Sequence, residues 1–151
     1  MPKPYRDCVV GVFIDSQGQL LLGERSDLPG TWQLPQGGVE AGETHEMAIY
    51  REMHEELGVS KFEIINKIDS AVYYDFPPNL DSPLGKKFRG QSQIWYLLKF
   101  SEKIDLKQLN TKEEFRAYKW DSVANTIDQA IEWKKDVYNQ GLRGLGLQAR
   151  I

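Results

Sequence analysis

The sequence predicts a domain that combines helices and strands (α/β, in the wider α+β sense), in which a mixed β-sheet carries helices on its faces and residues 1–151 form a single unit. Short apolar runs separated by turn residues are typical of strands. Two other segments, over 44–57 and 127–139, show the spacing of apolar residues that is typical of helices. A length of 151 residues, 40% of them hydrophobic, suits one core.

The first two predicted strands run from Asp7 to Ile14 and from Gln19 to Glu24. They flank the polar turn Ser16-Gln17-Gly18, so we expect them to form a hairpin. The next segment, GTWQLPQGGVEAGE over residues 30–43, gathers four glycines around Pro35. Such a backbone turns sharply and can approach a ligand closely.

A helix is predicted over residues 44–57. Thr44 suits the N-cap, Gly58 suits the left-handed residue that ends a helix, and Glu43 places negative charge at the start, where the helix dipole favours it. One face of this helix is apolar and is expected to pack against the sheet through Met47, Ile49, Tyr50, Met53 and Leu57.

The remaining elements follow from the same patterns. Further strands are expected over one or two segments of 62–76, strongly over 91–100, and briefly over 115–120. A second helix is predicted from Ile127 to Asn139, with Gly141 as its stop. The glycine-rich tail over 141–151 has no clear period, so we expect it to be partly mobile.

The most informative group of residues is an acidic cluster on the first helix. Glu52, Glu55 and Glu56 are related as i, i+3 and i+4, so all three project from one face, and no basic residue from 52 to 60 relieves their repulsion. A bound cation is the natural partner, and hard oxygen ligands favour Mg²⁺ or Mn²⁺. The alternative interpretation is a solvated acidic face.

The segment from Gly37 to Val59 resembles the signature of the Nudix hydrolases at every fixed position: glycine, five residues, glutamate, seven residues, then Arg-Glu-apolar-any-Glu-Glu-any-Gly-apolar. The resemblance implies an α/β/α sandwich with a loop-helix-loop catalytic motif. It also implies an enzyme whose glutamates hold more than one divalent cation against a diphosphate while water attacks phosphorus. Charge neutralisation of this kind is what a polyphosphate anhydride needs before attack.

The resemblance also implies roles for individual residues. Glu52 and Glu56 are expected to be the main metal ligands, Glu55 a further ligand or a water-orienting group, and Gly37 a ligand through its carbonyl. Arg51 is expected only to orient carboxylates.

A narrower resemblance covers nearly the whole chain. Segments outside the acidic motif are similar to bacterial RNA pyrophosphohydrolases, and also to the neighbouring diadenosine tetraphosphate hydrolases of the plant and bacterial type: Tyr5-Arg6, residues 32–38, 48–52 and 90–95, Glu114-Phe115 ahead of Trp120, and residues 133–138. The implied reaction converts the 5′-triphosphate or diphosphate end of RNA to a monophosphate and exposes the transcript to decay.

Two other functions remain open at this point. One is a dinucleoside polyphosphate hydrolase that uses the same metals and the same attack on phosphorus. The other is a Nudix-fold module that binds nucleotides without hydrolysis; intact Glu52, Glu55 and Glu56 argue against it. The sequence does not indicate whether a protein activator is needed.

The narrower resemblance also implies substrate-site residues. Glu114 is expected to approach the metals and to help activate water, although a loop carboxylate beside Glu113 is the alternative. Arg25 and Trp133 are candidates to sandwich a base, because a guanidinium and an indole both stack on aromatic rings. Further candidates for phosphate or base contacts are Arg6, Lys134 and Tyr74. The alternative for Trp133 is a core aromatic.

Lys86, Lys87 and Arg89 lie in the Pro/Gly-rich connection from Phe76 to Gly90, where a mobile basic loop could guide a polyanion. A solvated loop is the alternative. The net charge of −3 argues against extensive duplex binding, but a reader of 5′ ends needs only a local basic rim.

Composition excludes several other classes. The longest apolar runs fall far short of the roughly 20 residues of a membrane span, and the start MPKPYRD has no signal-peptide pattern, so we expect a cytoplasmic protein without a membrane partner. The lone Cys8 lies in an apolar stretch and is expected to be a core thiol.

Overall fold

The computed structural model describes residues 2–148 and has two sheets. The larger sheet is mixed. Its strands follow the order β4-β1-β7-β5, and β6 also pairs with β7. β1 and β7 are parallel, and β4, β5 and β6 run antiparallel to their neighbours. The strands are β1 (Tyr5–Phe13), β4 (Gln36–Gly38), β5 (Phe62–Lys67), β6 (Val72–Asp75) and β7 (Gly90–Phe100).

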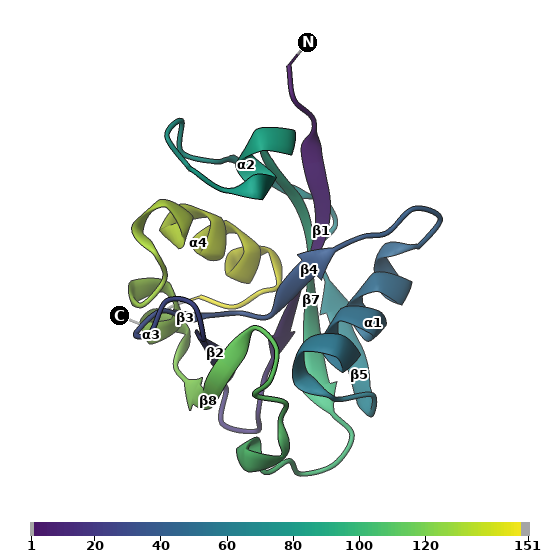
Figure 1. Ribbon diagram of the computed structural model, residues 1–151. Helices are drawn as coiled ribbons and strands as arrows, with labels where there is room; N and C mark the ends of the chain where they lie inside the picture. The colour runs from purple at the N-terminus through teal and green to yellow at the C-terminus, as the bar shows by residue number, and fades with distance from the viewer. Residues whose placement is uncertain (1, 149–151) are drawn as a thin grey trace.

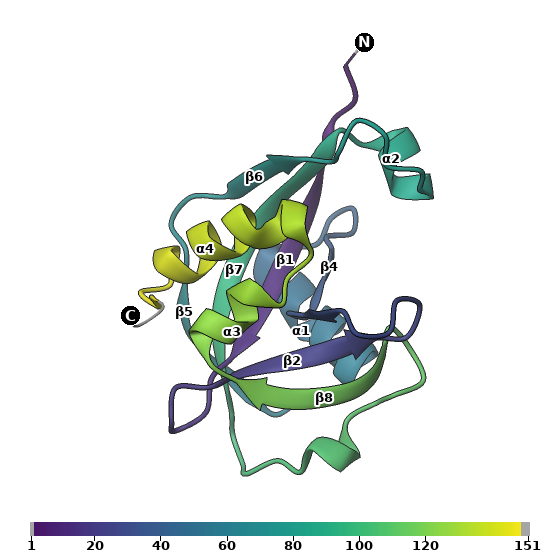
Figure 2. The same ribbon diagram turned by 90° about the vertical axis from the view of Figure 1, so that its left-hand side faces the viewer.

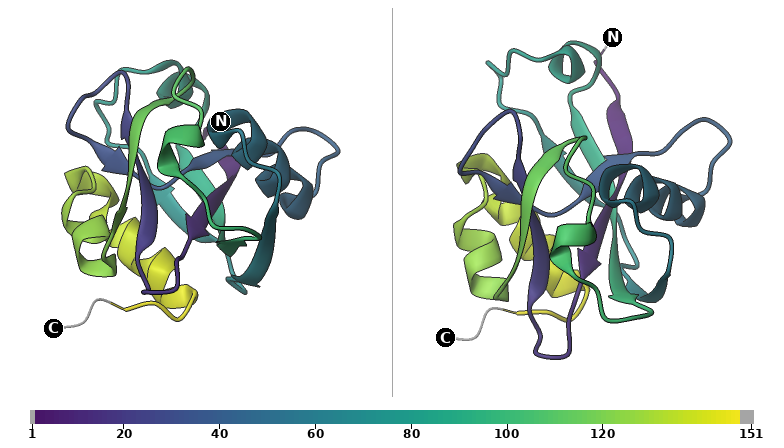
Figure 3. Two further views of the ribbon diagram at one scale, coloured as in Figure 1. Left: turned by 90° about the horizontal axis from the view of Figure 1, so that it is seen from below. Right: turned by 60° about the horizontal axis from the view of Figure 1, so that its bottom comes forward.

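The smaller sheet is antiparallel, with the order β3-β2-β8. It consists of β2 (Leu20–Arg25), β3 (Trp32–Gln33) and β8 (Phe115–Asp121). The views in Figure 3 show β2, in dark blue, beside β8, in green.

Helices cover both faces of the larger sheet, with α1 on one side and α4 on the other (Figure 1). The helices are α1 (His45–Leu57), α2 (Pro83–Lys87), α3 (Val123–Asp128) and α4 (Lys135–Gly144), with 3₁₀ turns η1 (Leu106–Gln108) and η2 (Glu132–Lys134). The predicted α/β/α layering is therefore confirmed. No helix among residues 2–148 is both long and apolar enough to cross a bilayer.

The alternation of side chains along β1 divides the core into two clusters. Val10 and Val12 face the cluster that contains Val137 and Leu142 of α4. Val9 and Phe13 face the opposite cluster, which contains Ile49, Met53 and Leu57 of α1. Successive residues of a strand point to opposite faces, so one buried strand holds a helix on each side. Cys8 of β1 is a buried free thiol, as predicted, and burial raises its pKa to about 11.

The predicted helix over 44–57 is confirmed, including both caps. The Thr44 side chain accepts a hydrogen bond from Met47 N at 3.1 Å, and Gly58 adopts a left-handed conformation with φ of 77°. The predicted apolar face is wrong at two positions, since Met47 is 57% exposed and Tyr50 is 38% exposed.

The predicted hairpin is wrong. β1 belongs to the larger sheet and β2 to the smaller one, and only an isolated bridge between Ile14 and Leu20 closes the turn. β1 instead pairs along its whole length with β7, which joins two central apolar strands. Turn chemistry indicates where a chain reverses, but it does not determine which strand becomes the neighbour.

The second predicted helix, over 127–139, is also wrong as one element. α3 ends at Asp128, Ile131 has an extended ψ of 140°, and α4 begins only at Lys135. The break allows α3 and α4 to cover different parts of one core cluster.

The predicted stop at Gly141 is wrong, because α4 continues to Gly144. Leu142 and Leu145, at 1% and 4% exposure, pack this part of the tail against the core. Residues 149–151, the rest of the tail that we expected to be partly mobile, lie outside the described residues.

Gly141 has a packing role that yields a stability prediction. A Cβ at this position would lie 2.2 Å from the indole ring of Trp95. Gly141→Ala normally stabilises a helix, but here the overlap with a buried ring should lower the free energy of unfolding by about 1–3 kcal/mol.

Urea denaturation measures this change. The exposed residue Asn139 lies on the same helix, so Asn139→Ala is a matched control that should stay within about 0.5 kcal/mol of the parent protein. A Gly141→Ala protein as stable as the control would contradict the close packing of α4 on Trp95.

Candidate active site

Arg51 organises the acidic face of α1. Its Nε and Nη2 donate to the two oxygens of Glu43 at 2.7 and 2.9 Å, which is a bidentate contact. Its Nη1 donates to Glu52 at 3.0 Å and to Glu55 at 3.1 Å, and its Nη2 also donates to the carbonyl of Gly38 at 2.7 Å. One side chain therefore joins the helix to the loop that precedes it.

These contacts change the expected charge balance of the cluster. The sequence has no basic residue from 52 to 60 to relieve the three glutamates, but Arg51, which we expected to orient carboxylates, directly precedes them and neutralises part of their charge. The hydrogen bonds from Arg51 are the main reason that the pKa of Glu43 falls to about 2. Glu43 accordingly belongs to the Arg51 network as well as to the start of the helix.

Glu52 lies against the glycine loop. Its side chain is largely buried, and its carboxyl carbon would be 1.9 Å from a Cβ on Gly37. Glycine is therefore required at position 37 for Glu52 to keep this place. Burial is the main cause that raises the pKa of Glu52. The structure thus brings together two residues that we expected to hold a metal.

A second carboxylate group is formed by Glu56 and Glu114, which come from α1 and from the residue before β8. Burial and the nearby charge of Glu114 raise the pKa of Glu56 to about 7. The backbone carbonyl of Glu114 accepts from Ser26 N at 2.9 Å, and its side chain accepts from Gln33 Nε2 at 3.1 Å. Glu113 is exposed, so Glu114 is the residue of this pair that faces the site.

Hard divalent cations fit the residues present here. Oε2 of Glu56 is buried without a hydrogen-bond partner among the described residues, and the Glu52 carboxylate occupies the space that a side chain at position 37 would need. Carboxylate and carbonyl oxygens suit Mg²⁺ and Mn²⁺. Glu55 is 53% exposed and bonds to Arg51. Within residues 2–148, no three acidic, histidine or cysteine side chains form a ready-made metal cluster.

A cationic group accompanies the carboxylates. Neither Arg6 nor Lys134 forms an ion pair with another described residue. Arg6 Nη2 would be 2.5 Å from a Cβ on Gly38, so its guanidinium lies directly against the glycine loop. Lys134 is only 9% exposed, and burial, followed by the charge of Arg25, lowers its pKa to about 8. A buried cation without an ion-pair partner, such as Lys134, is costly, which favours an anionic ligand.

Aromatic residues lie next to Lys134. Its Nζ is 5.4 Å from the centre of the Trp133 ring. Trp133 packs on Tyr74 with ring centres 5.7 Å apart and on Phe76 at 6.3 Å. The hydroxyl of Tyr74 is buried and has no hydrogen-bond partner among residues 2–148. Arg25 instead forms a bidentate pair with Asp27 at 2.7 and 2.9 Å, so its stacking role with Trp133 stays a prediction.

Sequence reasoning assigned no role to several glutamines at the site. Gln33 holds Glu114, as described above, and a row of amides extends from the glycine loop into the core. Trp95 Nε1 donates to Gln93 at 2.9 Å, and Gln93 Nε2 donates to Gln91 at 2.8 Å and to Gln36 at 3.3 Å. Amides at alternate positions of the apolar strand β7 were the pattern that could have identified this row.

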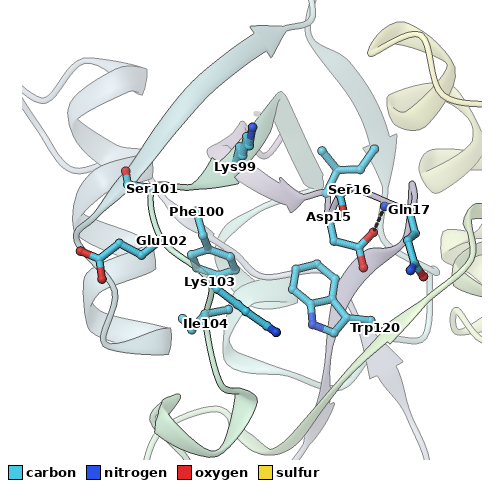
Figure 4. A pocket seen from close by; sticks show the side chains of 11 residues that line it. Asp15, Ser16, Gln17, Lys99, Phe100, Ser101, Glu102, Lys103, Ile104 and Trp120 are labelled. Atoms are coloured by element: carbon cyan, nitrogen blue, oxygen red, sulfur yellow. Dashed lines mark hydrogen bonds between the residues drawn. The ribbon is translucent and has the colours of Figure 1, made fainter.

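A cavity of about 690 Å³ lies elsewhere, beside the turn after β1 and the end of β7. Figure 4 shows Lys99, Phe100, Lys103 and Trp120 around it, and the rings of Phe100 and Trp120 are 6.2 Å apart and nearly perpendicular. None of its lining residues is a predicted site residue.

The raised pKa of Glu56 predicts how the stability of the metal-free protein depends on pH. Between about 4.5, its ordinary value, and about 7, the folded state binds more protons than the unfolded state, so stability should fall as pH rises through this range. Thermal midpoints in the presence of EDTA at pH 5, 6 and 7 measure the effect.

Glu56→Gln removes the titrating group, so its midpoint should change less over this range than that of the parent protein. Glu46→Gln, on an exposed position of the same helix, should keep the parent behaviour. A parent protein whose midpoint does not change between pH 5 and 7 would contradict the raised pKa.

Comparisons with known proteins agree with this architecture. The family model of the NUDIX domain matches residues 4–140 of this chain. The chain is 33% identical to Nudix hydrolase 25 of Arabidopsis thaliana, over 97% of this chain and 89% of that one. It is 36% identical to an RNA pyrophosphohydrolase of Wolbachia sp. subsp. Brugia malayi, over 97% of this chain and 93% of that one.

Among solved structures, the Ap4A hydrolase of C. elegans superposes with a TM-score of 0.62 at 20% identity, covering 88% of this chain and 93% of that one. At this identity the likeness concerns the fold alone. The match to the domain model extends over most of the sequence, and the relatives cover nearly all of it; the chain therefore belongs to the Nudix family and is a Nudix hydrolase.

Proposed function

We propose that this Nudix hydrolase is an RNA 5′-pyrophosphohydrolase, which converts the 5′-triphosphate or diphosphate end of RNA to a monophosphate and so initiates decay of the transcript. The observation that carries the proposal is one site that combines the buried carboxylate of Glu52 and the partly buried one of Glu56 with two cations that lack ion-pair partners among the described residues. Relatives named RNA pyrophosphohydrolase at 36% and 38% identity support this substrate class.

Metal binding is part of the proposal. Glu52, Glu56, Glu114 and the carbonyl of Gly37 would hold divalent cations, with Mg²⁺ as the expected ion and Mn²⁺ as a substitute. Such ions, when bound, neutralise the negative charge of the polyphosphate and make water a better nucleophile. Arg51 keeps Glu52 and Glu55 in place through its hydrogen bonds and does not itself need to touch the substrate.

Side chains of the protein accept the proton that the attacking water releases, and others bind the polyphosphate. As water forms its bond to phosphorus, an anhydride P–O bond breaks, and the released proton passes to a carboxylate of the Glu56 and Glu114 pair. Carboxylates are the general bases that this site offers. Arg6 and Lys134 supply positive charge to the polyphosphate, and Trp133, which packs on the buried Tyr74, supplies an aromatic surface for a base.

A dinucleoside polyphosphate hydrolase is the second candidate. The same carboxylates, cations and aromatic rings would accept a dinucleotide, because stacking on Trp133 is tolerant of base identity. A binding module without activity is disfavoured, since the carboxylates of the family motif are all present and Glu56 keeps a buried oxygen free.

The carboxylate assignment predicts a large loss of activity in Glu56→Gln. The amide keeps the shape of the side chain but removes its charge, and we expect kcat to fall by at least about a hundredfold. Mg²⁺-dependent release of pyrophosphate from a 5′-triphosphorylated RNA measures it, with Glu46→Gln as the matched control on the same helix. Near-normal turnover of Glu56→Gln would refute the metal assignment.

The substrate class is tested by direct competition of two substrates. Purified protein with Mg²⁺ receives equal concentrations of a short 5′-triphosphorylated RNA and diadenosine tetraphosphate, and initial rates of both products are followed. We expect faster conversion of the RNA to its 5′-monophosphate. A strong preference for the dinucleotide would favour the second candidate, and failure to turn over either would refute both.

A further inference from the structure

We infer that the surface around α2 binds the part of an RNA chain that continues beyond its 5′ nucleotides. This inference rests on the proposed function. The α2 surface consists of Lys3, Phe76, Lys86, Lys87 and Arg89, and it lies beyond the end of β6 (Figure 2). It would give this enzyme a preference for longer RNA over any free dinucleotide.

Contacts between aromatic side chains connect the α2 surface to the candidate active site. Trp133, beside Lys134, has its ring centre 6.3 Å from that of Phe76. Phe76 in turn lines a second cavity together with Lys3 and Arg89. A polynucleotide whose first base lies near Trp133 would therefore meet Phe76 and this cavity next.

The size of the second cavity fits one unit of a longer chain. Its volume is about 270 Å³, below the roughly 300–1,000 Å³ of pockets that enclose a whole drug-sized ligand. Phe76, Phe88 and Leu80 provide apolar walls, and Lys3 and Arg89 also line the cavity. A base or a ribose can occupy such a space while its phosphates remain on the basic rim.

The local charge is opposite to that of the whole chain. Four basic residues, Lys3, Lys86, Lys87 and Arg89, accompany only two acidic ones, Asp75 and Asp81, in a chain of net charge −3. Asp75 is already bound by Tyr5 at 2.6 Å and by Arg89 at 3.0 Å. Lys86 and Lys87 are exposed and form no ion pair within residues 2–148. Positive charge that lacks an internal partner attracts a polyanion.

Hydrogen bonds hold the α2 surface in a defined conformation. Lys3 Nζ donates to the carbonyl of Gly85 at 2.7 Å, which joins the start of the chain to α2. Ser82 caps α2 through a bond from Gly85 N at 3.1 Å. Arg89 lies 4.7 Å from the centre of the Tyr5 ring. The connection from Phe76 to Gly90, expected from sequence as a mobile loop, thus presents its lysines from a defined helical turn.

The test compares substrates that end before the α2 surface with substrates that reach it. Values of kcat/KM are measured for a 5′-triphosphorylated dinucleotide and for a hexanucleotide with the same first two nucleotides, and diadenosine tetraphosphate is a third substrate. The parent protein should favour the hexanucleotide by about tenfold. Lys86→Ala with Lys87→Ala should abolish most of that ratio and lower the salt dependence of hexanucleotide binding by about 1.4 in log–log slope.

Lys99→Ala with Lys103→Ala is the matched control. It removes the same charge from Lys99 and Lys103, which both line another cavity (Figure 4), and Lys99 is at the end of β7 that is far in sequence from α2. This variant should therefore keep the full hexanucleotide preference. Thermal midpoints confirm that both double variants are folded.

Each remaining outcome is decisive. Equal kcat/KM for the two RNA lengths, or equal losses in both double variants, would overturn the inference and leave the proposed function intact. Turnover of diadenosine tetraphosphate without turnover of either RNA would overturn the proposed function and the inference together.

Discussion

The ion-pair network of Arg51 is the interaction on which the candidate site depends. This guanidinium holds Glu43, Glu52 and Glu55 and the carbonyl of Gly38, so it joins α1 to the glycine loop before it. Without that charge, several carboxylates on one helical face would repel one another and destabilise the helix. With it, Glu52 stays against Gly37, and Glu56 is left free to face Glu114.

The parallel pairing of β1 and β7 determines which basic side chains lie near the carboxylates of α1. The two strands stay in register from Tyr5 and Gly90 to Phe13 and Leu98. The central strands carry α1 on one side and α4 on the other, so the carboxylates of α1 and the cation of Lys134 come from opposite layers. Arg6, at the start of β1, lies against Gly38 of the glycine loop. The carboxylates of α1 and the two basic side chains can thus lie around one polyphosphate.

Much of the fold could be predicted because its causes are local. The caps at Thr44 and Gly58, the spacing of Ile49, Met53 and Leu57, and most strand positions depend on neighbours within a few residues. The errors arose where distant contacts decided. β1 pairs with β7 and does not form the predicted hairpin with β2. The segment 127–139 is divided between α3 and α4, and each of these helices contacts the core.

The sequence by itself determined the family and the acidic helix, since the spacing from Gly37 to Val59 places the glutamates on one face wherever the helix lies. Only the tertiary structure decided that Arg51 reaches the carbonyl of Gly38 in the glycine loop. It also decided that Glu56 meets Glu114, which Gln33 supports. The physical reason is that a carboxylate's pKa and partners depend on burial and on charges from distant segments. Spacing along one helix cannot supply them.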